Sequence, residues 1–252
     1  MRRWVDWYDW FGDRDALMAE SNNVNPLAGK PLRYLIGADD AGRGADDVVT
    51  VSPYRTRPAR HGWSIAYCNL FDELNTGQYG PYLRTSDTAR EYGEGQIDPR
   101  GPGWRKNLDE QFRWCWRHGF QYIELDNPDA YSVEDVIGAI ELAATYGLKV
   151  IAKNPGLLDR GGWPRESIPL VAHSNVYGII VERGAGTASS MHYLRKEAKK
   201  VDLPVWFVAF GEGRPWADGV AKQASSFYNI GVTYSDHGEY GNAIDILMPV
   251  VA

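Results

Sequence analysis

The chain has 252 residues, of which 44% are hydrophobic and 24% are charged, a globular composition that excludes a disordered chain. Its 27 Lys and Arg stand against 33 Asp and Glu, a formal net charge of −6, so a basic face for nucleic acid is not expected. No run of about 18 apolar residues occurs, and we expect no membrane-spanning segment.

The first half of the chain contains apolar runs that predict three strands, with helical patterns beside them. The strands are expected at 4–10, 32–37 and 63–69, and the helices at about 13–20 and 105–118. Two longer segments separate these elements. Residues 38–62 are expected to be an irregular or hairpin insertion, and residues 71–103 a loop rich in Gly, Tyr and Pro.

The second half alternates between short apolar runs and amphipathic segments. The runs are rich in Val, Ile, Tyr and Phe and too short for helices, which is typical of buried parallel strands: 120–126, 148–153, 177–182, 204–210 and 230–235. After the first run, Ser132–Asp135 forms a capping box that opens a helix, and Gly147 closes that helix. Apolar stripes predict three further helices, at about 191–201, 220–227 and 244–251.

Three strands followed by five strand–helix units make eight strands, the number in a (β/α)₈ barrel. We therefore expect a single α/β domain over residues 1–252, a TIM barrel with long loops at about 38–62 and 71–103. A doubly wound open sheet is the alternative, but no glycine-rich phosphate loop follows any strand. Both long loops follow strand ends, which is the side where barrel active sites form.

Ionisable side chains end several of the expected strands. Glu124 and Asp126 are two residues apart, so both point to one face of their strand. Lys153 ends the next strand, and Glu182 ends the one after it. An acid at a strand end is often only a helix cap or a loop-ordering group, and Lys153 could be only a counter-ion. The convergence of three strand ends on one barrel mouth favours a functional site.

When several carboxyls and a lysine meet at one small barrel mouth, the carboxyls are expected to differ in pKa. Repulsion between carboxylates raises the pKa of one carboxyl, while the lysine keeps another ionised. An acid and a nucleophile at a glycosidic bond require such a difference. The aromatic residues, 10 Trp, 15 Tyr and 7 Phe, suit sugar stacking, although core packing is the default interpretation for most of them.

Several short motifs follow one another in a distinctive order. They are Tyr67 on the third strand, Asp98-Pro-Arg100, Glu124-Leu-Asp126-Asn127-Pro-Asp129-Ala-Tyr131, Lys153-Asn154 and Glu182. In this order the segment 98–154 resembles the glycoside hydrolase family 114 barrel, the endo-α-1,4-polygalactosaminidases and their relatives. Leu125 replaces the usual proline, Arg183-Gly184 replaces a Glu-Cys type continuation, and the first strand lacks the usual sequence. These departures leave Asp126 and Glu182 in place and bear on the substrate.

The resemblance implies a glycoside hydrolase that cleaves an amino-sugar polymer of the galactosamine type. We expect a two-carboxylate mechanism of the retaining form, because a lysine shared between the two acids draws them together. A separation of about 6.5–9.5 Å between the carboxyls, in place of about 5–5.5 Å, would indicate the inverting form. Asp126 is then the expected nucleophile and Glu182 the expected acid/base, with the reverse assignment open. Substrate contacts are expected from Tyr67, Glu124, Asn127, Asp129, Tyr131, Lys153, Asn154, Trp206, Tyr234 and Asp236. For the aromatic members of this set, packing in the core is an equal alternative.

Two other functions fit the same residues. Glu124, Asp126 and Glu182 could bind Mg²⁺ in a metal-dependent lyase or isomerase with Lys153 as base, although no histidine joins the cluster. A non-catalytic carbohydrate-binding barrel is the other alternative. The hydrolase hypothesis carries no metal and no cofactor. Its expected partner is a carbohydrate polymer or oligosaccharide bound by a monomer, with no nucleic acid and no membrane.

Localisation and thiol chemistry stay open. Asp6 and Asp9 interrupt the apolar region that a signal peptide needs, so none is visible, yet the family resembled is largely secreted or periplasmic. Cys68 and Cys115 match no zinc or redox spacing. We expect them to be buried free thiols rather than one disulfide.

Overall fold

The structure is a computed structural model that describes residues 25–28, 30, 32–35, 48–54, 56–58, 62–73, 76–83, 93–154, 168–182, 203–210, 230–235 and 245–250. Residues 33–35, 181–182, 207–210, 230–235 and 245–250 are described by their backbone. The expected strand at 4–10 and the expected helices at 13–20, 191–201 and 220–227 fall outside these ranges.

The described strands form one sheet in which neighbours in space are neighbours in sequence. The strands are β1 (Leu32–Leu35), β2 (Val48–Val51), β3 (Trp63–Asn69), β4 (Tyr122–Asp126), β5 (Lys149–Lys153), β6 (Val176–Glu182), β7 (Val205–Phe210), β8 (Ile230–Ser235) and β9 (Asp245–Val250). Every pair from β1 to β8 is parallel, and β9 is antiparallel to β8. This unbroken order has no reversal point, so the doubly wound alternative is wrong for these strands.

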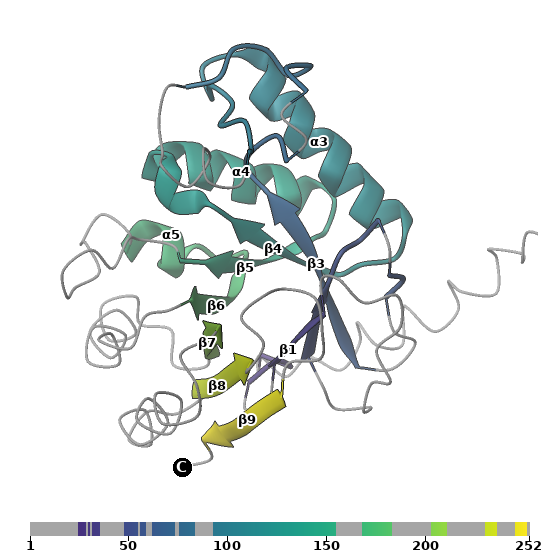
Figure 1. Cartoon of the computed structure of the whole chain (residues 1–252), viewed down its shortest axis with the longest axis vertical. Coiled ribbons are helices and arrows are strands. Elements are labelled where there is room, and N and C mark those ends of the chain that lie inside the picture. The colour runs from purple at the N-terminus through teal and green to yellow at the C-terminus, as the bar shows by residue number, and fades with distance from the viewer. Residues whose placement is uncertain are drawn as a thin grey trace, which may run out of the picture.

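The sheet curls, and its helices lie on the outside of the curve. Figure 1 shows α3 (Pro102–Arg117), α4 (Val133–Thr145) and α5 (Ile168–Ala172) on one side of β3 to β6. The first strand, β1, comes close to β8 and β9 at the other end of the sheet. Short parallel strands that bend with their helices outside are the arrangement of a barrel. The strands expected at 63–69, 120–126, 148–153, 177–182, 204–210 and 230–235 are confirmed within two residues at each end.

Two elements differ from the expectation. The run Val48–Val51, placed by sequence in the 38–62 insertion, is the buried strand β2, because four residues of high β-propensity pair on both sides with β1 and β3. The helix expected at 244–251 is wrong, since Asp245–Val250 forms β9. Pro249 would break a helix, whereas it is tolerated in a terminal strand such as this one, which has a single neighbour.

Apolar side chains fill both faces of the sheet. The outer cluster joins the strands to the helices and includes Phe112, Ile123, Ile140 and Val150. A separate inner cluster consists of Leu27, Leu32, Val48, Ile65, Tyr122, Ile151, Ile180 and Trp206. Burial of each large apolar side chain stabilises the fold by about 1.5–3 kcal/mol. The inner cluster lies next to the polar residues at the strand ends.

Helix α4 begins and ends as its sequence predicts. The Ser132 hydroxyl accepts a hydrogen bond from the backbone N–H of Asp135 at 3.1 Å, which caps the first turn. Gly147, with φ of 70°, lies just beyond the end of the helix, in the left-handed region that glycine adopts without strain. These two signals fix the direction in which the chain leaves β4 and enters β5. None of the helices described is long and apolar enough to cross a membrane.

The two cysteines are neighbours across the interface between β3 and α3. The Sγ atoms of Cys68 and Cys115 are 3.6 Å apart, and both residues are buried free thiols. Burial, followed by the contact with Cys115, holds the pKa of the Cys68 thiol well above its usual range. A thiol that stays protonated and buried is a poor nucleophile.

We therefore expect Cys68 and Cys115 in the native protein to react neither with thiol reagents nor with mild oxidants. Titration with Ellman's reagent should detect no thiol in the folded protein and both thiols in guanidinium chloride, because unfolding exposes them. The same titration after reduction serves as the control. Absence of thiols in the unreduced, unfolded protein would show that a disulfide had formed instead.

Candidate active site

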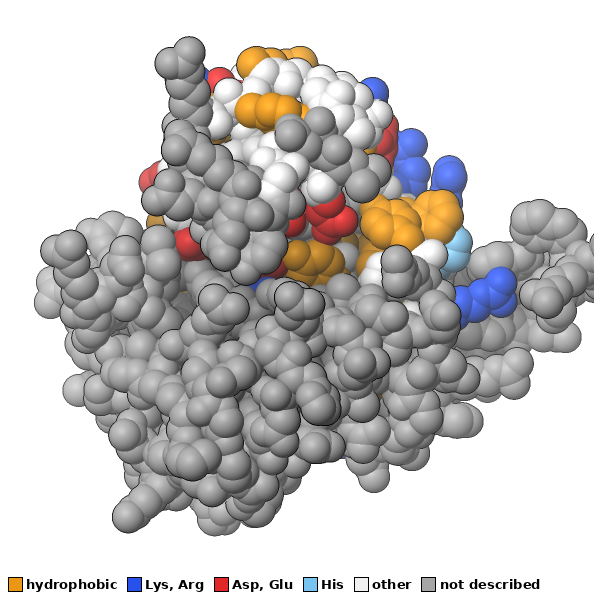
Figure 2. Space-filling view, viewed as in Figure 1, with side chains coloured by type: hydrophobic (Ala, Val, Ile, Leu, Met, Phe, Trp, Pro, Cys, Tyr) orange, Lys and Arg blue, Asp and Glu red, His pale blue; other side chains and the backbone are white. Residues whose placement is uncertain are grey.

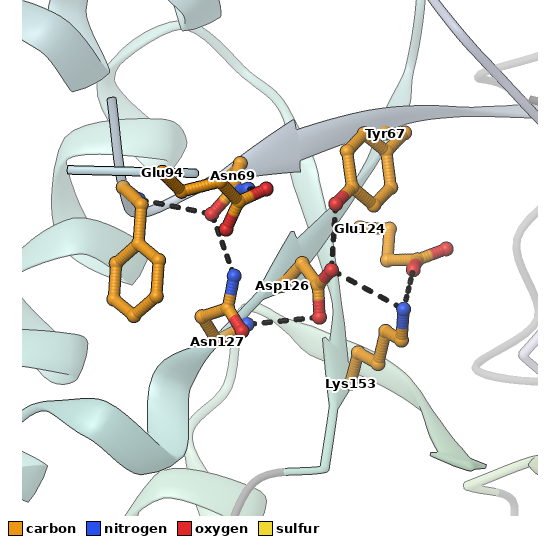
Figure 3. A network of polar contacts seen from close by, with 8 residues as sticks. Tyr67, Asn69, Glu94, Glu124, Asp126, Asn127 and Lys153 are labelled. Carbon is orange, nitrogen blue, oxygen red and sulfur yellow. Dashed lines mark hydrogen bonds and ion pairs between the residues drawn. The ribbon is translucent and has the colours of Figure 1, made fainter. Parts of the chain in front are cut away.

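Asp126 is the centre of the polar residues at the carboxyl ends of the strands. It is the last residue of β4 and is 8% exposed. Its Oδ2 accepts hydrogen bonds from the Tyr67 hydroxyl at 2.6 Å and from Lys153 Nζ at 3.2 Å, and its Oδ1 accepts one from the backbone N–H of Asn127 at 2.9 Å. Figure 3 shows these three donors around the carboxylate. Of the strand ends predicted to meet, those of β4 and β5 do so here, through Asp126 and Lys153.

Lys153 lies between two acids and is fully buried. Its Nζ is 3.2 Å from Asp126 Oδ2 and 3.8 Å from Glu124 Oε1, and the Glu124 side chain is also fully buried. Glu124 and Asp126 project from one face of β4, while Lys153 comes from the adjacent end of β5. Charges so deeply buried are stable only when they are paired. Asp126, Glu124 and Lys153 are thus a single electrostatic unit.

Tyr67 completes this unit from the other side of β4. It lies on β3 in register with Glu124, and its ring is 5.7 Å from Lys153 Nζ. Burial, and next the Asp126 charge, raise the pKa of the Tyr67 phenol well above its usual range. The phenol therefore stays a hydrogen-bond donor to Asp126.

A second set of contacts joins Asp126 to the loop after β3. Asn127, which has φ of 61°, donates from Nδ2 to Asn69 Oδ1 at 2.8 Å. Asn69, at the end of β3, donates from Nδ2 to Glu94 Oε1 at 3.0 Å. Neither Asn69 nor Glu94 was among the residues predicted from sequence. Asn69 is the last residue of β3, so the strand-end criterion could have found it, whereas the loop position of Glu94 carries no sequence signal.

Helix α3 fixes the end of β3 through two of its polar side chains. Gln111 accepts a hydrogen bond from the Asn69 N–H at 3.1 Å and donates one to the Asn69 carbonyl at 2.8 Å. Asn107, one turn earlier, donates to the carbonyl of Phe71 at 3.2 Å. These contacts satisfy strand-end backbone groups that would otherwise be buried without partners. The end of β3 is therefore contacted by α3 on one side and by β4 on the other.

Glu94 has a raised pKa. The pKa of the Glu94 carboxyl is raised to about 7, first by burial and then by the charges of Asp126 and Glu73, against the lowering effects of the Asn69 hydrogen bond and Lys153. The pKa of Glu73 is also raised, by burial and then by Asp126 and Asp72. Glu94 therefore changes its charge near neutral pH, at the rim of the site.

The remaining predicted residues lie in different surroundings. Tyr131 packs against Phe71 and Trp104 and donates to the Leu70 carbonyl at 3.1 Å, so it holds the loop after β3. Asp129 is exposed on η2 (Pro128–Ala130), a short 3₁₀ turn. Asn154, with φ of 44°, follows β5, and its N–H donates to the Ile180 carbonyl at 2.8 Å.

Trp206 is placed away from the polar residues. It is 1% exposed within the inner apolar cluster, and its Nε1 donates to the Lys30 carbonyl at 2.8 Å. Its place in the core is the alternative that the sequence left open, and as a sugar contact it is not supported, because its ring is covered on all sides. Glu182 ends β6 and Tyr234 lies in β8, both described by backbone only, and Asp236 lies outside the described residues.

The described residues of the site combine carboxyls with hydrogen-bond donors. Within the described part of the chain, no group of three or more His, Cys, Asp or Glu could hold a metal ion. Lys153 occupies the space between Glu124 and Asp126 that a cation would need. The site instead presents one carboxylate surrounded by donors and, beside it, a second carboxyl that titrates near neutrality.

Comparisons with known proteins find similarity at the level of the fold. No family model matches the chain, and no curated protein matches it in sequence. Among solved structures, Aspergillus fumigatus Ega3 in complex with galactosamine matches with a TM-score of 0.60 and 12% identity, over 91% of this chain and 98% of that one. The glycoside hydrolase domain of PelA from Pseudomonas aeruginosa matches with a TM-score of 0.50 and 17% identity, over 78% of this chain and 90% of that one. The expected resemblance to family 114 is thus confirmed for the fold.

Proposed function

We propose that this chain is a glycoside hydrolase that cleaves a galactosamine-containing polysaccharide, with Asp126 and Glu182 as its carboxylate pair. The observation that carries the proposal is the buried Asp126 carboxylate, held by Tyr67, Lys153 and Asn127 at the carboxyl edge of the sheet. Catalytic residues of (β/α)₈ barrels occupy this edge. The shared fold with a glycoside hydrolase domain supports the same assignment.

Asp126 is the nucleophile in this proposal. Its three donors stabilise the negative charge, and their geometry fixes the direction of both carboxylate oxygens. Attack on the anomeric carbon breaks the glycosidic bond and forms a covalent glycosyl-enzyme, which water then hydrolyses. The two displacements together retain the configuration of the sugar.

Glu182 is the acid/base. It ends β6, two residues after Ile180, and residues two apart lie on the same face of a strand. Ile180 belongs to the inner apolar cluster and is in register with Lys153. Glu182 would protonate the leaving oxygen in the first step and accept a proton from water in the second. The eight parallel strands would close into a barrel, which brings β4 and β6 to one mouth.

The galactosamine polymer is the substrate class that best fits the charge. The protein carries a formal charge of −6, and Figure 2 shows acidic side chains near the centre of the described surface on one face. A deacetylated amino-sugar polymer is cationic and would be attracted to such a surface. Ega3, which shares the fold, binds galactosamine. Tyr67, Asn127 and Asn154 are the proposed sugar contacts, and the enzyme would act as a monomer without a cofactor.

The proposal predicts that Asp126→Asn and Glu182→Gln each lower kcat at least about 10²-fold, because each removes a group that acts in the chemical step. Release of oligosaccharides from acetylated and deacetylated galactosamine polymers measures this loss. Glu141→Gln, on the exposed outer side of α4, is the matched control and should keep normal turnover. Normal turnover of either site variant on a hydrolysed substrate would exclude that carboxylate from the pair.

Lys153→Met should destabilise the fold by about 3–5 kcal/mol, since it leaves the buried Asp126 and Glu124 charges without their cation. It should also reduce kcat, because Asp126 loses one of its three donors. Chemical denaturation and kinetics on the same preparation measure the two effects. Lys149→Met is the control on the same strand: Lys149 is half-buried over the rings of Tyr122 and Tyr177, and its loss should cost about 0.5–1 kcal/mol. Equal stability of the two variants would contradict the central role of Lys153.

A further inference from the structure

Asn69 uses both sides of its amide within the site. It is fully buried at the end of β3 and is in register with Asp126 on β4. Its Oδ1 accepts hydrogen bonds from the Phe71 N–H at 2.9 Å and from Asn127 Nδ2 at 2.8 Å. Its Nδ2 donates to Glu94 Oε1 at 3.0 Å. A continuous chain of contacts therefore runs from Glu94 through Asn69 and Asn127 to Asp126 (Figure 3).

We propose that Asn69 is a positioning residue of the catalytic site, which aims the Asp126 carboxylate through Asn127 and fixes the Glu94 carboxyl beside it. The inference rests on the proposed function, because it assigns how the nucleophile of that reaction is held. Asn69 itself is placed behind Asn127 and does not touch the Asp126 carboxylate. Its effect on the reaction is exerted through Asn127 and Glu94.

An asparagine suits this position for a chemical reason. The oxygen of its amide accepts from two donors while its nitrogen donates to a carboxylate, a combination that aspartate and leucine lack. The contact from Asn127 matters because that residue has φ of 61°, a conformation that costs a non-glycine residue free energy. Because Asn69 holds the Asn127 side chain, the backbone N–H of Asn127 stays hydrogen-bonded to Asp126 Oδ1.

Asn69 also affects the pKa of Glu94, the carboxyl next to Asp126. The groups that act on Glu94 are Asp126 from β4, Glu73 after β3 and Lys153 from β5, together with the Asn69 amide. Burial and then the two acids raise the pKa of Glu94, and the Asn69 amide and Lys153 lower it. Conversion of that amide to a carboxylate would replace a lowering contact by a like charge. The Glu94 midpoint must then move upward from about 7.

The decisive variant is Asn69→Asp, which keeps the size and both accepted hydrogen bonds but sets a carboxylate against Glu94. We expect kcat to fall at least about tenfold, toward the roughly 10²-fold cost of a misplaced reacting group, with KM changed less than about twofold. Because the Glu94 charge lies beside Asp126, we also expect the pH dependence of kcat near neutrality to move to higher pH. The double variant Asn69→Asp/Glu94→Gln restores a donor–acceptor pair with its direction reversed and should recover most of the lost kcat.

Two further variants separate positioning from stability. Asn175→Asp is the matched control: Asn175 lies before β6, at the opposite end of the strands, and donates to the Leu148 carbonyl at 2.9 Å. It should lower the melting temperature while kcat and the pH profile stay unchanged. Asn127→Gly removes the contact to Asn69 in a residue that adopts a positive φ without strain, so it should lower kcat even if Asn69→Asp does not fold.

A measurement without substrate makes the test independent of the proposed function. Carboxyl ¹³C NMR titration should show the Glu94 midpoint rising by about one pH unit or more in Asn69→Asp, and not in Asn175→Asp. If this shift occurs but the wild-type protein hydrolyses no galactosamine polymer, the proposed function fails and the coupling stands. An unmoved midpoint, or an active enzyme in which both Asn69→Asp and Asn127→Gly keep full kcat, would overturn the inference.

Discussion

A lysine ammonium buried between two carboxylates is the interaction on which the rest of the site depends. Removal of such charges from water costs several kcal/mol for each ion, and only close pairing with good geometry offsets that cost. Lys153, Asp126 and Glu124 meet this requirement with distances of 3.2 and 3.8 Å. The position of every neighbouring group is constrained in turn, because a shift of one strand by a single residue would turn its charged side chain to the opposite face and leave a buried charge alone.

The parallel order of the strands is what makes this pairing possible. Tyr67, Asp126 and Lys153 come from β3, β4 and β5, which are consecutive in the chain and adjacent in the sheet. The carboxyl ends of parallel strands emerge at one edge, so residues distant in sequence meet there. Helix α3 adds a second constraint, since Gln111 holds both backbone groups of Asn69 and thereby the strand end next to Asp126.

The sequence was informative wherever one rule determined the structure. Apolar runs located most strands, and alternation along β4 correctly placed Glu124 and Asp126 on one face, next to Lys153. It failed where neighbours in space decide the outcome. The four residues of β2 become a strand because β1 and β3 lie on either side, and Glu94 joins the site from within a loop whose path no periodicity encodes. Trp206 illustrates a third case, in which a residue type suits two roles and only its burial selects the core.

The neighbours of two nearby carboxyls, Asp126 and Glu94, have opposite character. Asp126 is surrounded by a hydroxyl, an ammonium and a backbone N–H, all of which donate to it. Glu94 has one amide donor and faces two other acids, and burial together with these acids raises its pKa to about 7. The rim of the site therefore gains negative charge as the pH rises through neutrality. Asn69 contacts both Glu94 and Asn127, so one uncharged side chain links the carboxyl at the rim to the residue whose backbone N–H binds Asp126.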